Sequence, residues 1–248
     1  MPASQISRRS RLFVAFALAC VVLLLVVNTS VAQIPEFGEF HTWTDLATIY
    51  NLGHGFRYDG DYGIRGLLTD PNWTLIYLRP SVRYNAKDWL LLHGGFALFY
   101  NFFKDVEDLP ELRPWIGVRF VGPRPGGYTI TNYIRLEGRM FYLKDEDRWD
   151  KSLRGRWQIQ VVTPDFAIGK REPFYGIASV EPFFDLGPTT EVVLASRYRF
   201  NIGLGHRLAR GLRAEVNYVF HKARVADGDT DFDFDDHIVR LRFFWVIN

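Results

Sequence analysis

The sequence predicts an all-β protein, a transmembrane antiparallel β-barrel of about 10–12 strands, on three observations. Long segments alternate apolar and polar residues with a period of two, which places one kind of side chain on each face of a strand. Short turns and longer charged loops join these segments in alternation, and the last segment is rich in aromatic residues. These features are typical of barrels in the outer membrane of Gram-negative bacteria.

Residues 1–32 are predicted to be a cleaved secretory signal peptide. Arg8, Arg9 and Arg11 precede an unbroken apolar run from Leu12 to Val27, and Ser30-Val31-Ala32 is a small-x-small cleavage site. The run is shorter than the roughly 18 residues of a spanning helix. An uncleaved anchor and a lipoprotein site at Cys20 are the alternatives. The barrel is assigned to residues 33–248.

Removal of the signal peptide changes the composition of the chain. Lys+Arg falls from 30 to 27 against 28 Asp+Glu, so the mature chain carries a charge of about −1. A nucleic-acid-binding domain would be strongly basic. Cys20 is the only cysteine, so the exported chain is expected to fold without disulfides. A membrane-embedded chain without apolar helices must close as a barrel to pair its backbone groups.

Strand character begins near Phe40 and continues to about Leu68, either as one bent strand or as a hairpin that turns at Asn51 to Gly53. Thr69 to Asn72 is a turn by composition. Further strands follow at residues 73–85, 89–103, 111–121 and 128–143, and Gly122 to Gly127 forms a turn.

The second half of the chain begins with a charged loop from Lys144 to Asp150, and residues 163–173 are irregular. Its strands are predicted at 153–162, 174–186, 192–205, 212–221 and 239–247. The count is therefore ten or eleven. Because bacterial single-chain barrels have an even number of strands, ten or twelve is expected, with one strand merged or split near the start or near Thr163.

The charged faces of the strands are predicted to line the interior, or lumen, of the barrel. A charge facing the middle of a bilayer costs roughly 2–4 kcal/mol, whereas the apolar faces carry almost none. The predicted lumen set is dominated by arginine, with fewer carboxylates: Arg79, Arg83, Arg113, Arg119, Arg135, Glu137, Arg139, Arg154, Arg156, Glu181, Arg197, Arg199, Arg213, Glu215, Arg240 and Arg242, with Glu111 beside them.

Two interpretations of this lumen remain open. Arginine binds carboxylates through a planar fork, so an Arg–Glu–Tyr network could simply fill a narrow barrel. Alternatively, the surplus of arginine could bind or conduct an anion.

Other chemistry has weaker sequence support. Residues 227–236 begin like a calcium loop but lack the glycine at the sixth position and the glutamate at the twelfth, so an acidic outer loop is expected instead. His93 and His221 are predicted to face the lumen, and no serine lies in a nucleophile motif. A lipid-modifying enzyme would need a histidine brought to a serine or asparagine in space. A soluble periplasmic calyx would need the apolar face inside.

Several short motifs resemble a widespread family of bacterial outer-membrane proteins that is catalogued only as a domain of unknown function. They lie at residues 39–45, 112–115, 134–139, 181–184 and 196–205, and the resemblance extends over nearly all of residues 36–248. It implies a β-barrel in the outer membrane and brings no known activity or catalytic residue.

The sequence therefore predicts a monomeric outer-membrane barrel that acts structurally or as a narrow, anion-preferring pore. Its expected partners are the lipid bilayer, the barrel-insertion machinery and a small anion, with no nucleic acid. No cofactor, metal site or catalytic residue is predicted. The alternatives from other classes are a small lipid-modifying enzyme and a periplasmic calyx.

Overall fold

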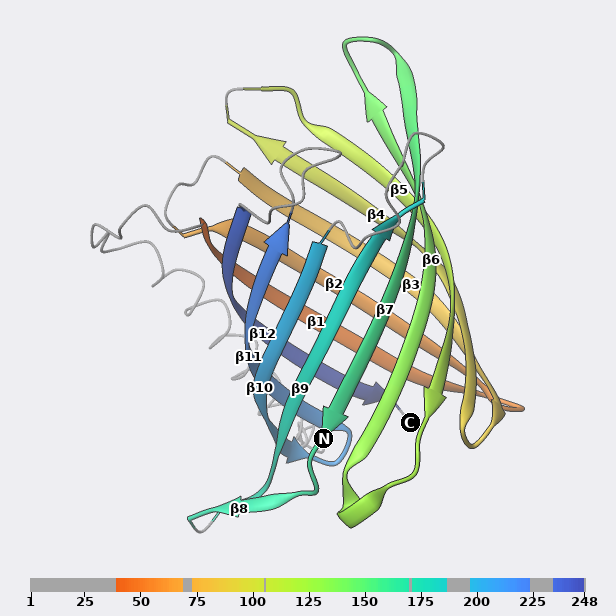
Figure 1. Cartoon of the computed structure of the whole chain (residues 1–248), viewed down its shortest axis with the longest axis vertical. Coiled ribbons are helices and arrows are strands. Elements are labelled where there is room, and N and C mark those ends of the chain that lie inside the picture. Colours follow the sequence, from red (N-terminus) through yellow and green to blue (C-terminus); the bar gives the residue numbers. More distant parts are fainter. Residues whose placement is uncertain are drawn as a thin grey trace, which may run out of the picture. The chain divides into compact units, whose positions relative to one another are not determined.

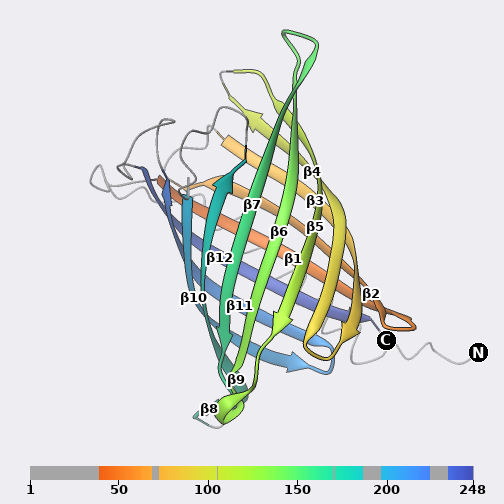
Figure 2. The ribbon, with the colours of Figure 1, turned by 45° about the vertical axis from the view of Figure 1, so that its right-hand side comes forward.

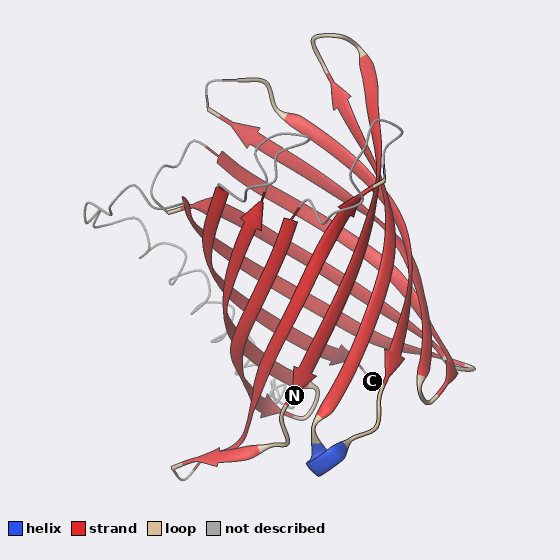
Figure 3. Ribbon diagram, in the orientation of Figure 1, coloured by secondary structure: helices blue, strands red, loops and turns tan. Residues whose placement is uncertain are grey.

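The computed structural model describes residues 39–68, 73–104, 106–169, 171–186, 197–223 and 234–247. Almost all of them lie in strands (Figures 1 and 3). The strands are β1 (Glu39–Gly53), β2 (Phe56–Leu67), β3 (Trp73–Lys87), β4 (Leu90–Phe103), β5 (Leu109–Val121), β6 (Thr129–Leu143), β7 (Arg148–Val162), β8 (Phe166–Ile168), β9 (Arg171–Asp185), β10 (Arg197–Ala209), β11 (Leu212–Ala223) and β12 (Phe234–Ile247). A short 3-10 turn, η1 (Pro125–Gly127), precedes β6.

Eleven of these strands close into a barrel, because each pairs with its neighbour and β10 also pairs with β9. The three-residue strand β8 pairs only with β9 and takes no part in the closure. The strands run obliquely around the barrel, as the turned view shows (Figure 2). The prediction of an all-β barrel of about 10–12 strands is confirmed.

The prediction of an even strand count is wrong, because the barrel has eleven strands. Strand direction alternates around the ring, so an odd number leaves one parallel pair. That pair is β1 with β12, in register from Glu39 opposite Asp236 to Tyr50 opposite Ile247. We call this pairing the seam. It places the start of β1 beside the start of β12, at the opposite end of the barrel from Ile247.

The ambiguous first segment is a hairpin, one of the two alternatives. β1 and β2 are antiparallel, and Gly53, His54 and Gly55 all have positive φ in the turn between them. The predicted loop from Lys144 to Asp150 is shorter than expected, because β7 already begins at Arg148 and continues the ladder with β6. The irregular segment near Thr163 contains β8, so no barrel strand was merged there.

The connections divide the barrel into two ends. One end carries the turns after β1, β3 and β10, together with η1 and β8; Figure 1 shows the end of the chain on this side. We call it the short-turn end. Strands β2, β4, β6, β9 and β11 end at the other end of the barrel, which we call the long-loop end.

The wall is apolar outside and polar inside. Outward side chains such as Ile76, Ile116 and Ile202 are exposed, whereas Asp45, Glu137 and Glu181 are buried. A calyx with an apolar interior does not fit this arrangement.

Within the described residues, no helix is long and apolar enough to span a membrane. The predicted signal peptide and residues 227–233 of the acidic segment lie outside the described residues, and Phe234 to Asp236 begin β12.

Candidate functional site

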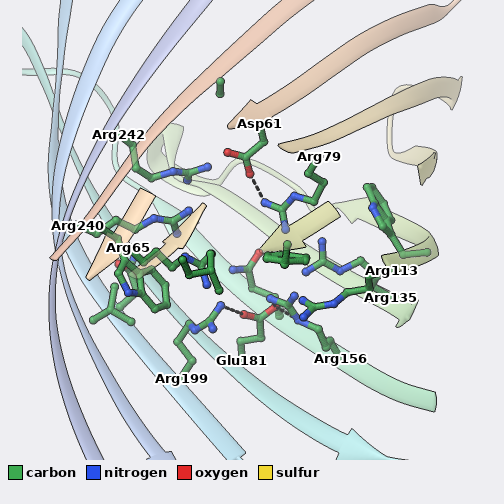
Figure 4. A pocket seen from close by; sticks show the side chains of 18 of the residues that line it. Asp61, Arg65, Arg79, Arg113, Arg135, Arg156, Glu181, Arg199, Arg240 and Arg242 are labelled. Carbon is green, nitrogen blue, oxygen red and sulfur yellow. Dashed lines mark hydrogen bonds and ion pairs between the residues drawn. The ribbon is translucent and has the colours of Figure 1, made fainter. Parts of the chain in front are cut away.

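A central cavity of about 600 Å³ lies inside the barrel and receives side chains from all eleven strands of the wall. Figure 4 shows arginines from different strands pointing toward one another in it. The arginines that line it are Arg57, Arg65, Arg79, Arg113, Arg119, Arg135, Arg139, Arg154, Arg156, Arg197, Arg199, Arg213, Arg240 and Arg242.

Fourteen of the sixteen residues predicted for the lumen line this cavity. The remaining two are Glu137, which is 1 % exposed, and Arg83, whose Nε lies 3.9 Å from Asp59. Six carboxylates also line the cavity, against fourteen arginines: Asp59, Asp61, Glu111, Glu181, Glu215 and Asp236. Even when the buried Asp45 and Glu137 are added, the lining arginines exceed the carboxylates by six among the described residues.

Glu137 on β6 is the centre of the largest ion-pair network. Its carboxylate lies 2.8 Å from Arg135 Nε, 2.6 Å from Arg154 Nη2 and 2.8 Å from Arg156 Nη1. Arg113 on β5 is 3.9 Å away. Four guanidiniums therefore share one carboxylate, and the contacts tie β5, β6 and β7 together on the inner face.

Glu181 extends this network around the barrel. It accepts from Arg156 Nη2 at 2.6 Å on one side and from Arg199 Nη1 at 3.2 Å on the other. Figure 4 shows the Glu181 carboxylate between these two arginines. Glu111 forms a separate pair of contacts, with Arg113 at 2.7 Å and Arg139 at 2.8 Å.

A second network lies near the seam. Asp45 on β1 accepts hydrogen bonds from Tyr77 (2.6 Å) and from Arg240, and Asp61 on β2 accepts from Tyr77 (3.0 Å) and from Arg79. A Cβ on Gly63 would lie only 2.5 Å from Asp45 Oδ1 and 2.6 Å from the Tyr77 ring. Glycine at this position therefore leaves room for the Asp45–Tyr77 contact.

Sequence reasoning missed Asp45 and Asp61 of this second network, and it also missed the cavity-lining residues Arg57, Asp59 and Arg65 on β2. Glycines interrupt the alternation of β2, and this obscured the faces of the strand. A signal was nonetheless present, because Arg57, Asp59, Asp61 and Arg65 are spaced in multiples of two and therefore share one face of β2.

Some arginines in the cavity have no carboxylate partner among the described residues. Arg119 stacks over Tyr133, with 4.5 Å from Cζ to the ring centroid, and Arg213 stacks over Phe244 at 4.0 Å. The Nε atoms of both are buried without a hydrogen-bond acceptor. These two side chains supply part of the surplus charge.

His93 on β4 contacts Ser81 on β3. His93 Nε2 lies 3.0 Å from Ser81 Oγ, and His93 Nδ1 lies 3.1 Å from the Tyr133 hydroxyl. Ser81 donates its own hydrogen to the backbone carbonyl of Asp59 (2.6 Å). His221, the other predicted lumen histidine, lies 3.5 Å from Asp236.

Outside the wall, charged groups gather on two loops at the long-loop end. A hydrogen bond with Asp145 raises the pKa of Glu107, and a hydrogen bond to Tyr100 (3.2 Å) raises the pKa of Lys144. Within the described residues, no group of three or more His, Cys, Asp or Glu side chains could hold a metal ion.

The fold and cavity define a closed β-barrel with an apolar outer wall and a charged interior. The chain belongs to the family described as a protein of unknown function, DUF2490, whose model matches residues 40–231. A search of curated proteins found no match.

Proposed function

We propose that this chain is an outer-membrane β-barrel that acts as a narrow, anion-preferring pore. The observation that carries the proposal is the surplus of arginine over carboxylate around the central cavity. Fixed charge of one sign in a confined space concentrates ions of the opposite sign. An interior network meant only to fill the barrel would need no such excess.

The membrane part of the proposal is supported by the outer wall. Leu78, Phe96, Ile134 and Val216 are among many large apolar side chains that are exposed on it. Contiguous apolar surface of this kind is unfavourable in water and favourable against lipid chains. In this proposal residues 1–32 direct export, the insertion machinery places residues 33–248 in the outer membrane, and the barrel is a monomer.

The first prediction concerns ion selectivity in planar bilayers. Under a KCl gradient, the reversal potential should indicate preference for chloride. The double variant Arg119→Gln/Arg213→Gln should lower that preference by roughly a third, because it removes two of the six surplus arginines and breaks no ion pair. These positions are better targets than Arg135 and Arg139, which are bound to Glu137 and Glu111.

The control for this prediction is Arg148→Gln, which removes an exposed arginine that pairs with Glu146 outside the cavity. Its selectivity should equal that of the unmodified barrel. A preference for cations, or equal selectivity in the unmodified barrel and the double variant, would contradict the pore proposal. A barrel that conducts no current would contradict the pore proposal and leave the structural role as the remaining interpretation of the interior.

A second candidate function, a lipid hydrolase, is favoured by the contact between Ser81 and His93. An outer apolar groove of about 450 Å³ is lined by His93 together with Val82, Leu92 and Ile116. The β3–β4 ladder skips Arg79 and Pro80, next to Ser81, and proline has no N–H to donate. Ser81 would attack an ester carbonyl while His93 takes its proton; the ester C–O bond would break, the alcohol would leave with that proton, and water would then release the acyl group from Ser81 as a fatty acid.

This candidate ranks second because the Ser81 hydroxyl donates to the backbone carbonyl of Asp59 rather than to His93. The test is release of fatty acid from phospholipid vesicles. Activity should disappear in both Ser81→Ala and His93→Ala and should persist in Ser179→Ala, a second serine lining the cavity. Equal release by Ser81→Ala and the unmodified barrel would eliminate this candidate.

A further inference from the structure

Four side chains form one row across the seam, on four successive strands. Asn217 on β11 lies opposite Arg240 on β12, Arg240 lies opposite Trp43 on β1, and Trp43 lies opposite Arg65 on β2. All four line the central cavity. The row therefore presents neighbouring side chains to one small part of the interior, at the only parallel pairing in the described barrel.

The row is rich in hydrogen-bond donors that have no acceptor. Trp43 and Asn217 are 4 % and 2 % exposed, and their donor atoms Nε1 and Nδ2 have no hydrogen-bond partner. Arg65 Nε is also buried without a partner. An unsatisfied buried donor is unfavourable, so an acceptor that reached these atoms would be bound favourably.

Positive charge is concentrated around Trp43. The Cζ atoms of Arg65, Arg199 and Arg240 lie 3.9, 5.3 and 5.6 Å from the centroid of its ring. Arg199 is paired with Glu181 and Arg240 with Asp45. Arg65 has no carboxylate within 4.0 Å among the described residues, so its charge is the one available to a ligand. Figure 4 shows Arg65 beside Arg240 at the edge of the cavity.

We propose that this row is a binding site for a small free oxyanion of the phosphate class. The row offers several donors on neighbouring strands, and an oxyanion carries several oxygen acceptors on one atom; arginine suits such groups because its fork can donate twice. A lipid headgroup is a poor occupant, since the row lies well inside the strands rather than at an end of the barrel. The proposed site specifies where an anion would bind inside the pore, and it rests on the pore proposal.

The test is calorimetric titration of the detergent-folded, full-length barrel with inorganic phosphate. Arg65→Gln should weaken binding about tenfold or more, because it removes a charge-assisted contact. Trp43→Phe removes the Nε1 donor together with part of the ring over which Arg65 lies, and it should weaken binding about three- to tenfold. Arg148→Gln, which removes an exposed arginine outside the cavity, should bind phosphate as the unmodified barrel does. Each variant is first checked for a heat-sensitive mobility shift on a gel, which reports a folded barrel.

The phosphate titration and the bilayer measurement together distinguish failure of the binding-site proposal from failure of the pore proposal. Chloride selectivity in bilayers without phosphate binding, or with binding that Arg65→Gln leaves unchanged, would overturn the site and leave the pore intact. Binding that Arg65→Gln abolishes, in a barrel without ion selectivity, would support the site and overturn the pore. Absence of binding in the unmodified barrel would mean that water alone covers these donors.

Discussion

At the scale of single residues, the barrel interior depends on a few carboxylates shared among many arginines. Glu137 is the clearest case, because Arg135 and Arg154 have no other carboxylate within 4.0 Å among the described residues. Arg156 and Arg113 keep Glu181 and Glu111 as second partners. The loss of one carboxylate would therefore leave two guanidiniums uncompensated.

Glu137→Gln should destabilise the barrel by about 3–5 kcal/mol, because removing one partner of a buried ion pair leaves an unpaired buried charge. The measurement is the midpoint of urea unfolding in lipid vesicles. Adding Arg135→Gln should recover part of the loss, since the double variant removes one of the orphaned charges. Glu146→Gln is the control, because its pair with Arg148 is exposed and its variant should unfold like the unmodified barrel. Equal midpoints for Glu137→Gln and the control would mean that water in the cavity solvates the arginines.

At the scale of elements, the sequence predicts strands well where one face is continuously apolar. β3 and β4 are examples, since Leu78 and Phe96 are exposed while Tyr77 and Ala97 are buried, as the alternation predicts. Most of the lumen arginines could be assigned to the interior for the same reason. The alternation of apolar and polar residues with a period of two belongs to a single short segment, so it can be recognised without knowing the rest of the fold.

Prediction from sequence is poorer where glycine interrupts the pattern. In β2, Gly60 and Gly63 leave space for neighbouring tyrosines and for Asp45, a packing role that only the folded structure reveals. The partners of the arginines could not be predicted either. Glu137 and Glu181 belong to strands that are not adjacent, and Arg156 joins them from the strand between.

At the scale of the whole molecule, closure was the feature that sequence could not determine. The pairing of β1 with β12 joins residues nearly 200 positions apart, and nothing local to either strand specifies whether they run parallel. The even-number rule predicted antiparallel closure, whereas eleven strands require one parallel pair. The same closure brings Trp43 beside Arg240 and so creates the proposed oxyanion site.

Parallel closure predicts which cysteine pair can form a disulfide across the seam. Thr44 and Leu241 lie opposite each other, and alternation along β1 and β12 directs both toward the outer wall. In a chain with Cys20→Ser, the pair Thr44→Cys/Leu241→Cys should oxidise, because neighbouring strands place Cα atoms about 5 Å apart and a disulfide tolerates roughly 4.4–6.8 Å. The cross-link would enclose almost the whole barrel, so the unfolded, unreduced chain should migrate faster on a gel than the reduced chain.

The matched control is Thr44→Cys/Trp245→Cys. Trp245 pairs with Thr48, four residues further along β1, which separates it from Thr44 by about 13 Å along the strand. That distance exceeds the reach of a disulfide, so the control should stay reduced under the same oxidant. Oxidation of the control, with the Thr44/Leu241 pair unreacted, would show a different register or direction at the seam. It would also separate Trp43 from Arg240, so the oxyanion site would lose its structural basis.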